Sequence, residues 1–220
     1  MEPADLWYVA VTSHGSLLHV PGEVLRLRFL ERELFMLPVL AGDAVWSHPL
    51  IAADPSLRAD LYRLAARVPA LLDSLDRLPQ TLVHGDASPQ NLLVPTADPD
   101  TFVAVDWSLI GPCAVGYDLG QLLVGPAHAG RLDVAGLPAL AEAVLSAYTA
   151  GLADEGLRVD ADVVRSGFHA ALVVRSAFSA LPLRRLAGAP NRGDAALVAH
   201  RVRLARHLVD LGLALPTAGP

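Results

Sequence analysis

The chain has 220 residues, of which 53% are apolar and only 18% are charged. A chain of this length and apolar content can bury a sizeable core, which excludes an intrinsically disordered protein. With a formal net charge of −6 and no basic stripe, the chain lacks the cationic surface that nucleic-acid binding requires, so we expect no nucleic-acid partner.

All 17 basic residues are arginine, so the sequence contains no lysine and any mechanism that needs one is excluded. The single cysteine, Cys113, cannot form an internal disulfide, which fits a reducing compartment, and we expect an inert, buried thiol there. The acidic N-terminus lacks the pattern of a secretory signal. The apolar stretch 163–183 is interrupted by Arg165, His169 and Arg175 and predicts a buried helix. We therefore expect a cytoplasmic protein without a membrane partner.

The first forty residues predict a small β element followed by a helix. Residues 6–11 and 16–20 are short runs of β-forming residues separated by a glycine, and they predict a hairpin or two edge strands. Residues 23–40 have helical periodicity.

A long helix is predicted next. Asp54 and Pro55 have the character of an N-cap followed by proline at the first helical position. Leucines and a valine then recur at helical spacing from Leu57 to Leu75, which predicts a helix with one buried face that ends before Pro79.

The middle of the chain changes to short strands, and helices follow. The strands are predicted at 81–83, 91–94 and 101–105, with a turn at 95–100. The helices are predicted at about 117–124, 136–153, 161–181 and 194–213. This order predicts an α+β fold that is mainly α-helical, with polar residues gathered at the strand ends.

Three polar residues at these strand ends have the spacing of a phosphotransferase site. Asp86 is followed five residues later by Asn91, and Asp106 lies twenty residues after Asp86 at the end of an apolar strand. Phosphoryl transfer needs a carboxylate that orients the attacking hydroxyl and oxygen ligands that hold magnesium. A hairpin between Asn91 and Asp106 would bring all three side chains to one edge.

These motifs resemble those of the aminoglycoside phosphotransferase and choline kinase-like superfamily. The segment HGDASPQNLLV from His84, followed by FVAVDW ending at Trp107, is similar to the catalytic and metal loops of that family. The resemblance implies the protein-kinase architecture, here as a kinase-like C-terminal lobe, and phosphorylation of a hydroxyl on a small molecule with ATP and Mg²⁺.

The resemblance also implies roles for individual residues. Asp86 would be the catalytic base, and Asn91 and Asp106 the ligands of the magnesium and its nucleotide. Asp118, in a later Gly-Tyr-Asp-Leu segment, would brace the catalytic loop, although an Asp at a helix start has a structural role by default. His84 would support the loop by hydrogen bonding. The residue types alone leave Asp86 and Asp106 open as ordinary turn residues.

The sequence departs from this family in the part that holds the nucleotide. The family's N-terminal lobe has a phosphate-covering loop and a lysine paired with a glutamate. Here no glycine-rich loop occurs in the first fifty residues and no lysine occurs anywhere. Arg26 or Arg28 can stand in that place, but a guanidinium does not replace an ammonium like for like. We therefore expect the nucleotide lobe to be missing or truncated.

This departure leaves three accounts of the chain. It is a fragment of a longer kinase, a minimal protein that binds without transferring phosphate, or a chain that takes its second lobe from a partner. We expect residues 1–22 to be a β remnant of the hinge between lobes, 23–215 the kinase-like lobe with its catalytic loop at 84–91 and metal loop at 106–108, and 216–220 a tail.

Two other function classes compete with the enzyme. A kinase-like binding module without turnover is favoured by the missing lysine. A metal-dependent hydrolase would use His84, Asp86 and Asp106, and it needs further metal ligands that the sequence does not place nearby. Trp107, which follows the last of these residues, is expected to pack in the core.

Overall fold

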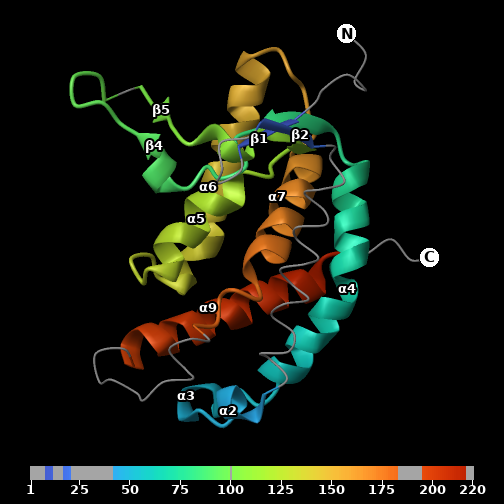
Figure 1. Cartoon of the computed structure of the whole chain (residues 1–220), viewed down its shortest axis with the longest axis vertical. Helices are drawn as coiled ribbons and strands as arrows, with labels where there is room; N and C mark the ends of the chain where they lie inside the picture. Colours follow the sequence, from blue (N-terminus) through green and yellow to red (C-terminus); the bar gives the residue numbers. More distant parts are fainter. Residues whose placement is uncertain (1–7, 12–16, 21–41, 100, 183–194, 217–220) are drawn as a thin grey trace.

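In the computed structural model, residues 8–11, 17–20, 42–99, 101–182 and 195–216 are described. Helices make up most of this part of the chain, and the short strands gather at one end of the helical layer (Figure 1). The predicted class, α+β and mainly α-helical, is therefore confirmed in its secondary structure. The helix predicted at 23–40 lies outside the described residues.

Two short helices that the sequence reasoning missed precede the long one. They are α2 (Asp43–Trp46) and α3 (Pro49–Ala52). The His48 side chain caps α3 by accepting a hydrogen bond from the backbone of Leu50, and Pro49 occupies the first helical turn. Each helix has only four residues, too few for a periodic pattern to reveal.

The long helix α4 (Leu57–Arg77) begins later than predicted. Asp54 and Pro55 do not start it; Ser56 is the N-cap, and its hydroxyl donates to the carboxylate of Asp54 in the preceding turn. The predicted buried face is confirmed. Its buried residues are Leu57, Leu61, Leu64, Val68, Leu71, Leu72 and Leu75.

Among the described residues, six short strands form three two-stranded antiparallel sheets. They are β1 (Tyr8–Val11), β2 (Leu17–Val20), β3 (Gln80–Val83), β4 (Leu92–Leu93), β5 (Val103–Ala104) and β6 (Gly111–Ala114). The pairs are β1 with β2, β3 with β6, and β4 with β5. The first pair confirms the predicted hairpin, and β1 also contacts β6 and the turn after Asp106.

Strand β6 was not predicted, because Pro112 lies within it and proline usually marks the end of a strand. Among the described residues β6 is hydrogen-bonded to β3 in a two-stranded sheet, where Pro112 lies opposite Leu82. Cys113 lies on this strand and is half-buried; burial raises the pKa of its thiol to about 12. This fits the predicted inert cysteine.

Four longer helices follow in the described part of the chain. They are α5 (Leu119–His128), α6 (Leu137–Asp154), α7 (Ala161–Ser176) and α9 (Ala195–Ala214). Single-turn 3₁₀ helices lie between the longer elements and include η2 (Pro89–Asn91), η3 (Trp107–Leu109) and η4 (Val134–Gly136). All four predicted helices exist, and their ends differ from the predictions by up to five residues.

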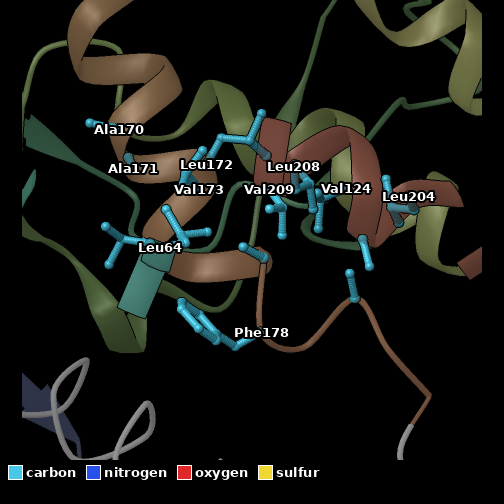
Figure 2. Close-up of a cluster of buried hydrophobic side chains, with 14 of the residues drawn as sticks. Leu64, Val124, Ala170, Ala171, Leu172, Val173, Phe178, Leu204, Leu208 and Val209 are labelled. Carbon is cyan, nitrogen blue, oxygen red and sulfur yellow. The ribbon is translucent and has the colours of Figure 1, made fainter. Parts of the chain in front are cut away.

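The core lies where α4, α7 and α9 cross. Helix α7 is buried along most of its length and contacts α4, α5, α6 and α9. Leu64 of α4, Val173 of α7 and Val209 of α9 all lie in this cluster (Figure 2). At the edge of the core, Arg206 of α9 forms an ion pair with Asp60 of α4 at 2.9 Å, which joins the two helices.

One stretch among the described residues, Val134–Asp154, is long and apolar enough to cross a membrane by length and composition. Its mean hydropathy is 1.2, and only 11% of it is buried. It corresponds to η4 and α6. The different apolar stretch at 163–183, predicted as a buried helix, is helical only as far as the end of α7 at Ser176 among its described residues. Length and composition are weak grounds for a span, so the absence of a membrane partner stays a prediction.

A substitution at Gly212 tests how closely α9 crosses α4 and α7. A Cβ at this position would lie 2.6 Å from Cδ1 of Leu64 and 2.7 Å from Cγ1 of Val173. We expect Gly212→Ala to lower the free energy of unfolding by about 1–3 kcal/mol, because it overpacks the crossing. Urea denaturation measures this change.

The matched control is Gly151→Ala on the exposed side of α6. Nothing lies within 4 Å of a Cβ there, so the same substitution should leave stability unchanged or raise it through better helix propensity. Equal effects of the two substitutions would contradict the close crossing.

Candidate active site

The loop after β3 makes a sharp turn that only glycine fits. Gly85 has a φ of +83°, and a Cβ there would lie 2.2 Å from the carbonyl oxygen of Leu109. Residues with a side chain rarely adopt this conformation. The turn therefore directs the backbone of Asp86 away from the strand, at the edge where η3 approaches.

The carboxylate of Asp118 holds this loop from behind. Its Oδ2 accepts a hydrogen bond from the backbone N–H of His84 at 2.7 Å, and its Oδ1 accepts one from Gly85 at 3.0 Å. Burial raises the pKa of Asp118, while these two hydrogen bonds and the positive charge of Arg175 lower it. Asp118 also precedes α5, but its side chain does not cap that helix. The geometry fits the loop-bracing role.

His84 ties the two loops of the site together. Its Nε2 lies 2.9 Å from the carbonyl oxygen of Val105, and its Nδ1 accepts a hydrogen bond from the backbone of Asp86 at 3.3 Å. Both ring nitrogens are therefore engaged with the backbone, with the proton on Nε2. The imidazole has no lone pair left for a metal, which fits a supporting role.

Trp107 was predicted to pack in the core, and this prediction is wrong. It is 48% exposed, and its ring lies 4.6 Å from that of His84. Its indole N–H donates to the carbonyl oxygen of Ala104 at 2.9 Å. The side chain covers His84 from the solvent side, because Trp107 begins the turn η3 at the surface of the site.

Asn91 orients Asp86. Its buried amide donates from Nδ2 to the backbone oxygen of Asp86 at 2.8 Å and to Oδ2 of the same residue at 3.2 Å. The five-residue spacing is what allows this contact, because η2 folds the loop back on itself. These bonds leave Oδ1 of Asn91 free to accept from, or bind, another group.

The hairpin of β4 and β5 brings Asp106 back beside Asn91. Leu92 pairs with Ala104, and the backbone N–H of Val105 donates to the carbonyl oxygen of Asn91 at 2.9 Å. Asp106 follows directly in a left-handed conformation, with φ 60° and ψ 62°. It is the one residue other than glycine with a positive φ in the described part of the chain, and such strain often marks a functional position.

Two serines take part in this geometry and were missed in the sequence. Ser108 donates from its hydroxyl to Oδ1 of Asp106 at 2.8 Å, which fixes that carboxylate. Ser88 lies between Asp86 and Asn91, and its Oγ is buried without a hydrogen-bond partner among the described residues. Single serines carry no spacing signal, so only the packed loop reveals them.

Behind the loop lies a cationic group that the sequence also did not reveal. The guanidinium of Arg175 in α7 lies 4.9 Å from the ring of Tyr117, and its charge acts on Asp118. Tyr117 is buried, and burial raises the pKa of its hydroxyl. The sequence gives no sign of this contact, because Arg175 belongs to a different helix.

The free oxygen atoms at the site have the chemistry of a magnesium site. Oδ1 of Asn91 and the carboxylate of Asp106 are hard donors of the kind Mg²⁺ prefers. No group of three or more His, Cys, Asp or Glu side chains suited to a metal occurs among the described residues. His84 is engaged as well, so the described residues show no further ligands for the metal-dependent hydrolase that the sequence left as an alternative.

The site thus combines a pinned loop with an Asp-Asn pair and a second Asp at the end of a hairpin. The class of the protein comes from the comparison with family models: a model described as the phosphotransferase enzyme family matches residues 18–159, well over half of the chain. The chain belongs to this family. No curated protein and no solved structure matches it.

Asp118→Asn tests the brace. An amide presents an NH₂ group to one of the two backbone donors, so one of the two hydrogen bonds is lost, at a cost of about 1–3 kcal/mol. We expect amide hydrogen exchange at His84 and Gly85 to become roughly 5- to 150-fold faster. Asp154→Asn, at the exposed end of α6, is the control. Unchanged exchange in Asp118→Asn would show that the loop holds itself.

Proposed function

We propose that this protein is a magnesium- and ATP-dependent O-phosphotransferase that phosphorylates a hydroxyl group of a small molecule. The observation that carries the proposal is the pairing of Asp86 with Asn91 next to Asp106, at the end of the β4–β5 hairpin. We further propose that the helices and this hairpin correspond to the C-terminal lobe of a kinase-like fold, in a cytoplasmic protein.

Asp86 would act as the base. Its carboxylate is held by Asn91 and remains partly exposed, so a hydroxyl can reach it. As the acceptor oxygen forms its bond to the γ-phosphorus, the bond from that phosphorus to the leaving ADP oxygen breaks, and the hydroxyl proton passes to Asp86. Positioning of this kind supplies much of the catalysis in phosphoryl transfer.

Asn91 and Asp106 would hold the metal. Bound Mg²⁺ would neutralise the charge of the phosphate oxygens. Asn91 offers its free Oδ1, and the Ser108 hydroxyl holds Oδ1 of Asp106, which leaves the second carboxylate oxygen of Asp106 for the metal.

The hairpin would also receive the base of the nucleotide. Leu93 and Val103 are directly paired across β4 and β5, and they are 48% and 45% exposed. Paired apolar side chains of this kind offer a flat surface beside Asn91 on which an aromatic base can lie. Their exposure supports the proposal, since a surface apolar pair gains from being covered.

A second candidate function is a kinase-like binding protein without turnover. The observation in its favour is the absence of lysine, the residue that pairs with the phosphates in kinases of known mechanism. Arg26 and Arg28, the replacements suggested by the sequence, lie outside the described residues. A further arrangement, in which a partner chain supplies the nucleotide lobe, also requires the same Asp86, Asn91 and Asp106.

Titration with MgATP and a metal-site variant tests whether the chain holds the metal and its nucleotide, and turnover then separates the two candidates. If MgATP binds, 100-fold excess over its Kd adds about 2.7 kcal/mol, or roughly 5–10 °C in Tm for a domain of this size. We expect this shift in the natural chain and its loss in Asp106→Asn or with EDTA. Asp154→Asn should keep it. A shift that survives in Asp106→Asn would contradict the metal site.

Turnover tests the base. In a chain that phosphorylates a hydroxyl compound, Asp86→Ala should lower kcat by about 10²- to 10⁴-fold, the usual contribution of a general base. The MgATP shift in Tm should remain, because Asp86 is not proposed to grip the nucleotide. Phosphate transfer to a panel of polyols and amino alcohols measures this. Full turnover in Asp86→Ala would show that another group accepts the proton.

A further inference from the structure

A pocket of about 290 Å³ lies where α5, α6, α7 and α9 meet. Each of the four helices contributes to its wall. The apolar part of the wall includes Leu123, Val124, Ala141, Leu172, Leu208 and Leu211. Figure 2 shows Val124, Leu172 and Leu208 close together at the junction of three of these helices.

The pocket is separate from the candidate active site. Helix α5 lies between them. Gly125 of this helix faces the loop that carries Asp86, because a Cβ at Gly125 would lie 3.7 Å from Cδ of Pro89. At about 100° per residue, Leu123 is turned roughly 160° away from Gly125 around the helix. The pocket wall is therefore on the side of α5 away from the loop, and no candidate catalytic residue lines it.

Its size and walls suit a compact aromatic molecule. An apolar cavity of roughly 150 Å³ lined by similar side chains can bind benzene. The pocket here is about 290 Å³, enough for two fused rings. Leu172 and Leu208 form its buried side, so a bound ring would replace empty space by contacts with side chains that already belong to the core.

Two imidazoles supply the polar part of the pocket. His169 of α7 and His207 of α9 both line it, and neither forms a hydrogen bond with another residue of the described chain. Burial lowers the pKa of both rings, which favours the neutral imidazole. A neutral imidazole offers one donor and one acceptor, and a hydroxyl group can satisfy either.

The charges at the rim are already paired. Glu142 of α6 lines the pocket, and its carboxylate forms an ion pair with Arg165 of α7. Because the two charges of this pair offset each other, the pair attracts an ionic ligand only weakly. An anion or a cation would also have to lose its hydration among leucines without a free counter-charge, which is costly.

We propose that this pocket binds an uncharged bicyclic aromatic molecule that carries one hydroxyl group, with its rings against Leu172 and Leu208 and its hydroxyl at His169 or His207. The site goes beyond the phosphotransferase function and does not depend on it, because no step of that reaction uses these residues.

Calorimetric titration of the whole chain with 2-naphthol tests the proposal. We expect saturable binding of one molecule per chain at pH 7. The anion 2-naphthoate, which has a similar ring system, should bind at least tenfold more weakly. Absence of binding by 2-naphthol, or tighter binding by 2-naphthoate, would overturn the assignment.

Two kinds of variant locate the ligand. Ala141→Phe should fill the pocket and abolish binding, whereas Ala143→Phe, on the exposed side of the same helix, should leave it unchanged. Circular dichroism checks that both variants keep the fold. Equal affinity in the two variants would show that 2-naphthol binds elsewhere and would overturn the proposal.

The hydroxyl contact has its own test. Removing one neutral hydrogen bond costs about 0.5–1.5 kcal/mol, which corresponds to a loss of roughly 2- to 13-fold in affinity. We expect this loss for 2-naphthol in either His169→Phe or His207→Phe, and no loss for 2-methylnaphthalene, which lacks the hydroxyl. Unchanged affinity for 2-naphthol in both variants would overturn the role of the imidazoles.

Discussion

The Asp118 carboxylate, which accepts the backbone N–H groups of both His84 and Gly85, is the interaction on which the site depends. Two adjacent amide groups in a turn with a positive φ have no strand partner, so they need an acceptor from elsewhere in the fold. Asp118 supplies both oxygens from the start of α5. The position of Asp86, one residue further on, is thus fixed by the packing of a helix.

That helix is held in turn by the core. A Cβ at Gly120 of α5 would lie 3.2 Å from the Cα of Leu172 of α7, and a Cβ at Gly167 of α7 would lie 2.0 Å from the carbonyl oxygen of Val115. Small residues at these crossings let the backbones approach closely. The loop that carries Asp86 therefore packs on α5, and α5 packs on the buried helix α7, which the core surrounds on several sides.

Helix α5 has two sides of opposite character. Toward the loop, α5 presents Gly125 to Pro89, and the chemistry there is that of oxygen donors. On its other side, Leu123 and Val124 help to enclose an apolar pocket with two neutral imidazoles. Each surface follows from side chains at successive positions, which point in different directions around a helix.

Local sequence patterns predicted most of the helices and the polar residues of the candidate site. The apolar spacing of α4 and the spacing of Asp86, Asn91 and Asp106 were readable from the chain, because a helix turn and a short hairpin relate residues that are near in sequence. Only the tertiary structure showed that β6 pairs with β3 and that Trp107 lies against His84 at the surface. It also brought four helices together around the pocket. Such contacts join elements distant along the chain, and packing rather than local spacing decides them.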